Sequence, residues 1–217
     1  MRFLLIHTAG AEGSVALADE AVVATEILPG RSSSERLVPV VRRLMEARGW
    51  TLGDLTAITV VHGPGSFTGV RVGLSAAKGF SEAAGVPLIV VSRLALLACA
   101  VGGDGVVHAV LDAGRGEFYY GEYAGRRCVR EVLLSGDELR ATLVGGVVVV
   151  CDAKVAEALV DLNPRVVAEP SAGDVLPFAV GRAAAGEFDD TALVDANYLR
   201  RTDAELFAGP KGESATR

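Results

Sequence analysis

The first third of the chain opens with three short apolar runs. They are residues 3–6, 13–19 and 21–28, and small or polar residues separate them. Runs of this length, rich in aliphatic and β-branched side chains and bounded by turn residues, are typical of neighbouring antiparallel strands. The chain is therefore expected to begin with a three-stranded meander.

The next segment, residues 33–48, changes to a helical period. Its apolar face consists of Leu37, Val41 and Leu44. Ser32 and Glu35 have the spacing of an N-terminal capping box, and Gly49 is suited to ending a helix. We therefore expect an amphipathic helix here, with its apolar face toward another part of the fold or toward a partner.

A strand, a turn, a helix and another strand follow. The apolar runs at 55–61 and 86–91 predict two buried strands. Between them lie a glycine-rich turn at 63–69 and a helix from about 70 to 84. A meander followed by a β-α-β unit indicates a mixed sheet with helices packed against it.

The pattern begins again near Val101. Residues 110–123 resemble residues 5–19: an apolar strand ends in a polar residue, and a turn of small residues leads to a second strand. The second half then contains a predicted strand at 145–152, helices at 153–161 and 171–186, and an extended segment at 195–200. It thus repeats the types of element seen in the first half.

The predicted fold class is α/β, with two tandem lobes that each contain a mixed sheet and flanking helices. We expect residues 1–101 to form the first lobe and residues 102–200 the second. Residues 201–217 contain little hydrophobic periodicity and are expected to form a loose tail.

Composition narrows the functional classes. Half of the 217 residues are hydrophobic and 22% are charged, so the chain can bury a sizeable core. A net charge of −6 disfavours a broad basic surface that binds nucleic acid directly. Cys99, Cys128 and Cys151 show no CxxC spacing and are expected to be reduced, buried thiols. Because no apolar run has the length of a membrane span or a signal-peptide core, we expect a cytoplasmic protein.

The glycine-rich turn fits none of the standard phosphate or nucleophile motifs. A P-loop needs four residues between its glycines and then a lysine, but three residues separate Gly65 from Gly69, and Val70 follows. A dinucleotide fingerprint would need a glycine at Thr68. Either the amides at the helix start hold an anion, or the glycines allow a close approach of strand and helix, which we favour. The residues of the turn are Gly63, Pro64, Gly65, Ser66, Thr68, Gly69 and Arg71.

The helix after the turn is apolar around most of its circumference, so it must be covered on two sides. One side can pack on the sheet, and the other needs a second helix or a partner protein. Arg71 lies in the first turn, where the helix dipole disfavours a cation, so it has either a specific acidic or carbonyl partner or a solvated side chain. The expected partner-binding residues are Leu37, Val41, Leu44, Val70, Gly73, Leu74 and Ala77.

These segments resemble the TsaB (YeaZ) family. The most specific match is "HGPGSFTGVRVGLSAAKGF" at 62–80, with support from "LLIHTAGAEGSVAL", "SSERLVPVVRRLM", "VPLIVVSRLALLA", "VLDAGRGEFYYGEY" and "ANYLR". The resemblance covers almost the whole chain. It implies two actin-like (RNase H-like) lobes and a role in making threonylcarbamoyladenosine at position 37 of tRNAs. It also implies the catalytic paralogue TsaD as partner, the ATPase TsaE as a further member, and contact with tRNA only through the complex.

The same resemblance argues against catalysis by this chain. The two metal-binding histidines of TsaD-like enzymes align with Arg93 and Leu97, and neither can replace a histidine. His7 stands where actin-like ATPases carry a carboxylate, so we expect a packed or hydrogen-bonded imidazole rather than a metal ligand. Asp112, the matching residue of the second lobe, is expected to be structural.

Nucleophilic catalysis is also disfavoured. His62 and Ser66 flank the turn, but no acid is found to orient the histidine, and the spacing of His108 adds nothing. Ser33 stands where relatives often carry a histidine before the partner-binding helix, so details of that contact are expected to differ.

Two functions remain. The first is a non-catalytic subunit without metal or cofactor, which docks on TsaD, or on a second copy of itself, through the helices at 33–48 and 70–84. The alternative is an actin-like nucleotide-binding protein or ATPase that uses the turn at 63–69 and Asp112.

Overall fold

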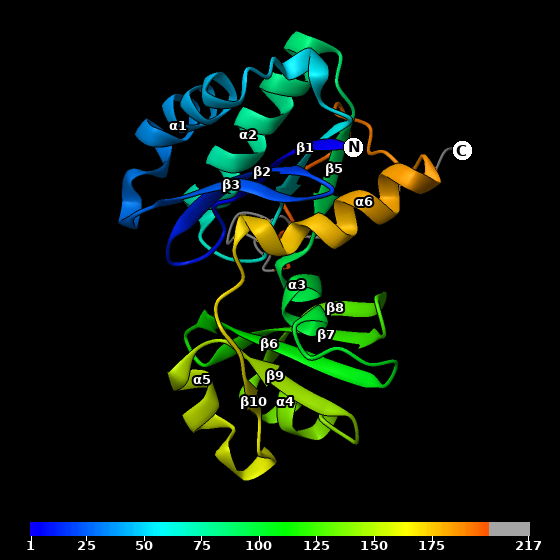
Figure 1. The fold of residues 1–217 in the computed structure, drawn as a ribbon. Coiled ribbons are helices and arrows are strands. Elements are labelled where there is room, and N and C mark those ends of the chain that lie inside the picture. Colours follow the sequence, from blue (N-terminus) through cyan, green and yellow to red (C-terminus); the bar gives the residue numbers. More distant parts are fainter. Residues whose placement is uncertain (200–217) are drawn as a thin grey trace, which may run out of the picture.

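The computed structural model describes residues 1–199, which form two lobes, each built on one sheet (Figure 1). Arg200 and the predicted tail at 201–217 lie outside the described residues. Within residues 1–199, no helix combines the length and apolar character needed to cross a membrane.

The first sheet has the strand order β3-β2-β1-β4-β5. The β1–β2 and β2–β3 pairs are antiparallel, whereas the β1–β4 and β4–β5 pairs are parallel. The strands are β1 (Arg2–His7), β2 (Gly13–Asp19), β3 (Ala21–Leu28), β4 (Ala57–Val61) and β5 (Leu88–Val91). The predicted meander and both predicted buried strands are confirmed.

The second sheet has the order β10-β9-β6-β7-β8, which is the order of the first sheet read from the opposite edge. Its β6–β7 and β7–β8 pairs are antiparallel, and its β6–β9 and β9–β10 pairs are parallel. The strands are β6 (Val106–Gly114), β7 (Glu117–Ala124), β8 (Arg127–Ser135), β9 (Val147–Val150) and β10 (Arg165–Val166).

The second lobe repeats the first element by element. In each, three antiparallel strands are followed by an α-helix, a strand, an α-helix, a strand and an α-helix. The α-helices within residues 1–199 are α1 (Ser33–Arg48), α2 (Phe67–Ala84), α3 (Arg93–Cys99), α4 (Gly136–Thr142), α5 (Ala153–Ala158) and α6 (Leu176–Ala185). This succession and strand order are those of the RNase H-like lobe of actin-like proteins, so the predicted fold class is confirmed.

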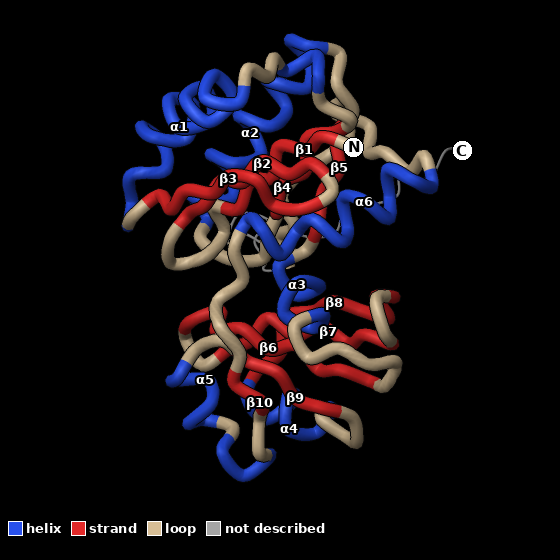
Figure 2. Tube along the Cα trace, in the orientation of Figure 1, coloured by secondary structure: helices blue, strands red, loops and turns tan. Residues whose placement is uncertain are grey.

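The helix that ends each repeat packs on the sheet of the other lobe. Helix α3 contacts β6, β7 and β9, whereas α6 contacts β1, β4 and β5. The short 3₁₀ helix η4 (Ala172–Val175), which precedes α6, also contacts the first sheet. Figure 2 shows α3 and α6 between the two sheets. The boundary expected near Val101 therefore separates the strands of the lobes, but not their helices.

This exchange gives the lobes a shared hydrophobic core. On one face of the first sheet, Leu4, Ile6 and Ile58 pack with α1 and α2. On the opposite face, Phe3 and Leu5 belong to a cluster that continues through α3 and α6 into the second sheet. Because apolar burial is the main stabilising term in folding, this continuous cluster couples the two lobes.

One predicted helix start and one predicted capping box are corrected, whereas α1 begins at Ser33 as expected. Helix α2 begins at Phe67 rather than near residue 70, because the Ser66 hydroxyl accepts a 3.3 Å hydrogen bond from the third amide of the helix. Ser32 does precede α1, but its hydroxyl donates to the Pro29 carbonyl at 2.7 Å. The capping box predicted for Ser32 and Glu35 is therefore wrong.

Candidate functional site

The glycine-rich turn is held against the connection between β1 and β2. The Thr8 hydroxyl donates to the Gly69 carbonyl at 2.7 Å, and the Ser66 amide donates to the Ala9 carbonyl at 2.9 Å. These bonds fix the N-terminus of α2 on the residues that follow β1.

Three glycines permit this approach. A Cβ on Gly65 would lie 2.1 Å from the Ala9 carbonyl oxygen, and one on Gly69 would lie 2.0 Å from the Thr8 carbonyl oxygen. A Cβ on Gly73 would lie 2.2 Å from Thr8 Oγ1. All three distances are far below van der Waals contact, so these positions require glycine. The motif thus brings strand and helix close together, as the favoured interpretation holds.

The other residues of the turn lie around this contact. Gly63 and Pro64 are buried and joined by a cis peptide bond, whereas Ser66 and Thr68 are exposed. Nδ1 of His62 lies 3.3 Å from the Asp195 carbonyl oxygen. Because Ser66 caps α2 and His62 contacts a backbone carbonyl, the two do not form a nucleophile and base pair.

Most of the predicted partner-binding residues belong to the core of the first lobe, which corrects their assignment to an exposed surface. The buried ones are Leu37, Val41, Val70, Gly73, Leu74 and Ala77, and Leu44 is half-buried. Ala77 is 0% exposed. Helical periodicity identifies residues that share a face, but a helix that is apolar nearly all round does not reveal which face points inward.

The outward face of α1 and α2 instead carries mostly small side chains, together with exposed Val38. Ser75, Gly79 and Ala83 are exposed on α2, and Val38 and Pro39 are exposed on α1. Figure 1 shows the two helices on the outer side of the first sheet, and they contact each other. These exposed residues form the outer surface of the helix pair, whereas the predicted ones other than Leu44 are buried beneath it.

The flank of α2 is covered by the chain's own C-terminal segment, residues 189–199. Lys78 Nζ donates to the Val194 carbonyl at 3.0 Å, and the hydroxyls of Ser81 and Thr191 lie 3.2 Å apart. This segment supplies part of the second cover that the apolar helix was expected to need.

Arg71 has an aromatic partner rather than an acidic one. Its guanidinium lies 3.7 Å from the centroid of the Phe67 ring, and its Nε donates to the Tyr198 hydroxyl at 2.7 Å. Because 127 residues separate Arg71 from Tyr198, sequence spacing gave no signal for this pair. Of the two expectations from sequence, the acidic or carbonyl partner is not observed within residues 1–199, whereas the side chain does remain exposed to solvent.

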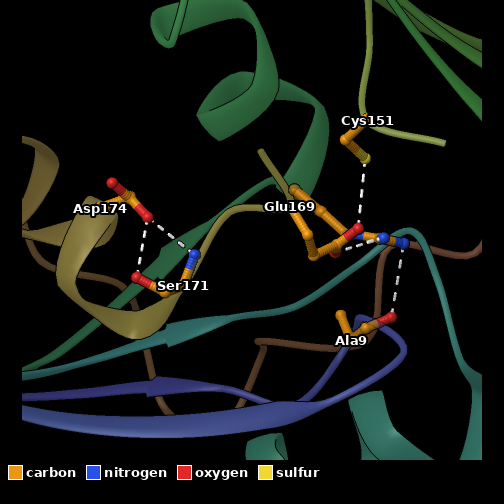
Figure 3. A network of polar contacts seen from close by, with 6 residues as sticks. Ala9, Cys151, Glu169, Ser171 and Asp174 are labelled. Carbon is orange, nitrogen blue, oxygen red and sulfur yellow. Dashed lines mark hydrogen bonds and ion pairs between the residues drawn. The ribbon is translucent and has the colours of Figure 1, made fainter. Parts of the chain in front are cut away.

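A polar cluster lies where strands of both lobes end (Figure 3). Arg93 follows β5, Cys151 follows β9, and Glu169 lies beyond β10. Nη2 and Nε of Arg93 donate to Glu169 Oε1 at 2.5 and 3.1 Å, and Cys151 Sγ donates to Oε2 at 3.2 Å. Burial and the Glu169 charge raise the pKa of the Cys151 thiol to about 12, so the thiol keeps its proton.

Ligands of α/β sheets commonly bind beyond the carboxyl ends of parallel strands. In this chain the Arg93–Glu169 ion pair crosses between the lobes at that position, and the Arg93 side chain is only 12% exposed. The pair therefore links the two lobes at that position, and Glu169 also lines a cavity of about 510 Å³ between α3 and the segment that leads into α6.

His7 is completely buried at the end of β1. Among the described residues, neither ring nitrogen has a hydrogen-bond partner. Burial, followed by the nearby charge of Arg93, lowers the pKa of His7 to about 4, so the ring is neutral at physiological pH. His7 is thus a packed imidazole, and residues 1–199 contain no cluster of three His, Cys, Asp or Glu side chains that could hold a metal.

The remaining candidate site residues pack in the core or form hydrogen bonds within the fold. Leu97 is fully buried in α3. Asp112 is exposed and accepts a 2.7 Å hydrogen bond from the Gly114 amide, which shapes the turn after β6. His108 is buried, with Nδ1 2.8 Å from the Tyr120 hydroxyl and Nε2 2.9 Å from a backbone carbonyl.

Sequence reasoning did not identify Glu131, which joins distant parts of the fold. Its carboxylate accepts hydrogen bonds from Ser92 Oγ and Asn197 Nδ2, each at 2.5 Å, and from the Tyr123 hydroxyl. Burial and the Glu131 charge raise the pKa of Tyr123 well above its usual range. No motif marks this set, because its members come from four separate segments.

Ser33 is buried at the start of α1. A Cβ on Gly13 would lie 2.7 Å from its hydroxyl oxygen, so Ser33 packs closely on β2. Ser33 therefore faces the inside of the lobe rather than the outward face of the helix.

Comparisons with known proteins agree with this fold and turn. The family described as TsaD, tRNA N6-adenosine threonylcarbamoyltransferase, matches residues 26–139, more than half of the chain. The tRNA threonylcarbamoyladenosine biosynthesis protein TsaB of Escherichia coli K12 is 39% identical over 128 residues, which are 57% of this chain and 55% of that protein. The match thus spans about half the length of this curated relative.

Two further relatives are matched over more of their length. An uncharacterized protein of Mycobacterium tuberculosis H37Rv is 34% identical over 180 residues, which cover 82% of this chain and 80% of that protein. The solved structure of YeaZ from Pseudomonas aeruginosa superposes with a TM-score of 0.72 at 28% identity, and the match covers 90% of this chain and 100% of that one. With the glycine-rich turn and both lobes accounted for, the chain belongs to the TsaB (YeaZ) family.

Proposed function

We propose that this chain is a non-catalytic subunit of the machinery that adds the threonylcarbamoyl group to adenosine 37 of tRNAs in the cytoplasm. In this role it docks on the catalytic paralogue TsaD, and the ATPase TsaE joins the pair. Support comes from the E. coli relative, whose name assigns it to threonylcarbamoyladenosine biosynthesis. Further support comes from the matching family, which is described as a threonylcarbamoyltransferase.

The observation that carries the non-catalytic part is the ion pair between Arg93 and Glu169. Arg93 stands at one of the two positions where the resemblance to TsaD-like enzymes would require a metal-binding histidine, and it is committed to Glu169 instead. Leu97 stands at the other position and lies in the core. His7 replaces the carboxylate that serves the metal of actin-like ATPases, and its neutral ring is a poor substitute for that charge.

The outward face of α1 and α2 is the surface that we assign to docking. Its exposed small residues, such as Gly79 and Ala83, allow another helix to approach closely. An isolated chain can use the same face to pair with a second copy of itself, and TsaD then competes for it. The net charge of −6 fits a subunit that reaches tRNA only through its partners.

Gly79→Arg tests this assignment. A Cβ on Gly79 meets no atom within 4 Å, so a long charged side chain can extend into solvent without disturbing the lobe. We expect the variant to fold normally and to bind TsaD at least tenfold more weakly than the wild type in sedimentation or calorimetry.

Gly181→Arg on α6 is the matched control, because Gly181 is also an exposed helical glycine with no atom within 4 Å of its Cβ position. It should bind TsaD like the wild type. If Gly79→Arg also binds like the wild type, the helix pair is not the docking surface.

A further inference from the structure

Arg71 forms an organised cluster with two exposed aromatic rings beside the docking helices. Its guanidinium lies 3.7 Å from the Phe67 ring centroid and 5.6 Å from that of Tyr198. The two rings are 6.0 Å apart, and the Tyr198 hydroxyl accepts from Arg71 Nε. The side chains thus hold one another in place before any partner arrives.

These rings remain open to solvent. Phe67 is 53% exposed and Tyr198 is 41% exposed, although each could bury a large apolar area in a contact. Aromatic and arginine side chains dominate the energetics of protein interfaces, and preorganised ones lose little conformational entropy on binding. Phe67 begins α2, so the cluster is continuous with the helix face assigned to docking.

A hollow of about 320 Å³ lies next to the cluster, between α2 and the C-terminal segment. Arg71 and Lys78 supply two positive charges to its lining, and Asp195 supplies one negative charge. Lys78 Nζ donates one hydrogen bond to the Val194 carbonyl oxygen. The Asp195 carboxylate accepts a hydrogen bond from the Ala196 amide. Within residues 1–199, Arg71 forms no ion pair.

We propose that this cluster and hollow receive an acidic side chain of the partner protein, with an apolar neighbour packed on the Phe67 ring. The proposal rests on the proposed function and takes TsaD as that partner. The terminal amino groups of Arg71 can bind a carboxylate in bidentate geometry, and the Lys78 ammonium has further hydrogens that can donate to it. A nucleic-acid backbone fits less well, because Asp195 lines the hollow and the chain as a whole is acidic.

Phe67→Ala and Arg71→Gln test the two halves of the site. Each should weaken TsaD binding at least tenfold in calorimetry while the melting temperature stays near that of the wild type. The wild-type affinity should also fall between 50 and 300 mM salt more steeply than that of Arg71→Gln, because the variant lacks the interfacial charge. Tyr198→Phe keeps the ring but removes the hydroxyl, so its affinity for TsaD should fall only a few fold.

The controls are Phe188→Ala and Arg127→Gln. Phe188 is 42% exposed beyond the end of α6, and Arg127 is exposed in the second lobe, so both should bind TsaD like the wild type. If the wild type binds TsaD and both Phe67→Ala and Arg71→Gln bind it equally tightly, this inference is overturned but the proposed function stands. Absence of wild-type binding would refute the proposed function itself. Loss of tRNA affinity by the assembled complex, without loss of TsaD affinity, would overturn the inference in favour of an RNA contact.

Discussion

Replacing His7 by leucine should remove a pH dependence from the stability of the protein. His7 is 0% exposed, and its pKa is about 4 instead of 6.5. Between these two values, the unfolded chain binds a proton at His7 that the folded chain does not bind. The free energy of unfolding therefore falls as the pH drops from 6.5 to 4, and the loss from this group ends below pH 4.

The size of the effect follows from the two pKa values. A difference of one pKa unit corresponds to about 1.4 kcal/mol, so the complete loss is about 3 kcal/mol, of which about 2 kcal/mol is lost by pH 5. Leucine has a similar volume and leaves no ring nitrogen unpaired. His7→Leu should consequently be at least as stable as the wild type at pH 7.5, and by about 1 kcal/mol if the unpaired nitrogens carry their usual cost.

Urea denaturation followed by circular dichroism measures this effect. Unfolding free energies of wild type and His7→Leu are compared from pH 7.5 to pH 5, and the difference between the two chains isolates His7 from the carboxylates that titrate in both. Thr59→Val is the control, because Thr59 is equally buried and its hydroxyl is unpaired among the described residues, but it does not titrate. It should keep the wild-type pH dependence. If wild type and His7→Leu lose stability in parallel, His7 is solvated or paired in solution and the reasoning is refuted.

Three further substitutions test the packing of α2 by urea denaturation. Gly69→Ala should lower the free energy of unfolding by about 3 kcal/mol, because the new Cβ would meet the Thr8 carbonyl oxygen at 2.0 Å. Gly79→Ala on the same helix should raise the free energy of unfolding by as much as about 1 kcal/mol, because its Cβ meets no atom within 4 Å and alanine favours the helix. Ala77→Arg should unfold the protein, because the position is 0% exposed and would bury an unpaired charge. Similar stabilities for the two alanine variants, or a folded Ala77→Arg, would show that the inner face of α2 is misassigned.

The strands of the first lobe were predictable because local signals bound them. Residues 13–19 and 21–28 match β2 and β3 at both ends, and a single residue, Glu20, turns between them with a positive φ of 64°. Gly49 ends α1 in the left-handed conformation, as its residue type indicated. These signals depend on neighbouring residues alone.

The exchange of helices between the lobes was not predictable in this way. Helix α3 is apolar along almost its whole length, so no period separates an inner from an outer face. Its position on the second sheet depends on the arrangement of the complete lobes. The expected division near Val101 falls between the strands of the two sheets, while α3 and α6 each pack on the sheet of the other lobe.

In the candidate site, too, local features were predictable from the sequence, whereas contacts between distant segments were not. The motif located the turn and its glycines, but not what the glycines approach, because Thr8 and Ala9 lie far away in sequence. Glu131 and Tyr198 were missed because their partners are brought together only by folding. The inward face of α2 was mistaken for a surface because its apolar residues run nearly all round the helix.

The central claim is that this chain supports threonylcarbamoyl transfer without carrying it out. The direct measurement is the amount of threonylcarbamoyladenosine formed in tRNA by the TsaD and TsaE of the same organism when an activated threonylcarbamoyl donor is supplied, with this chain present and with it omitted. Modified adenosine should form only when the chain is present, and this chain without TsaD should form none. Equal modification without the chain, or modification by the chain without TsaD, would contradict the account.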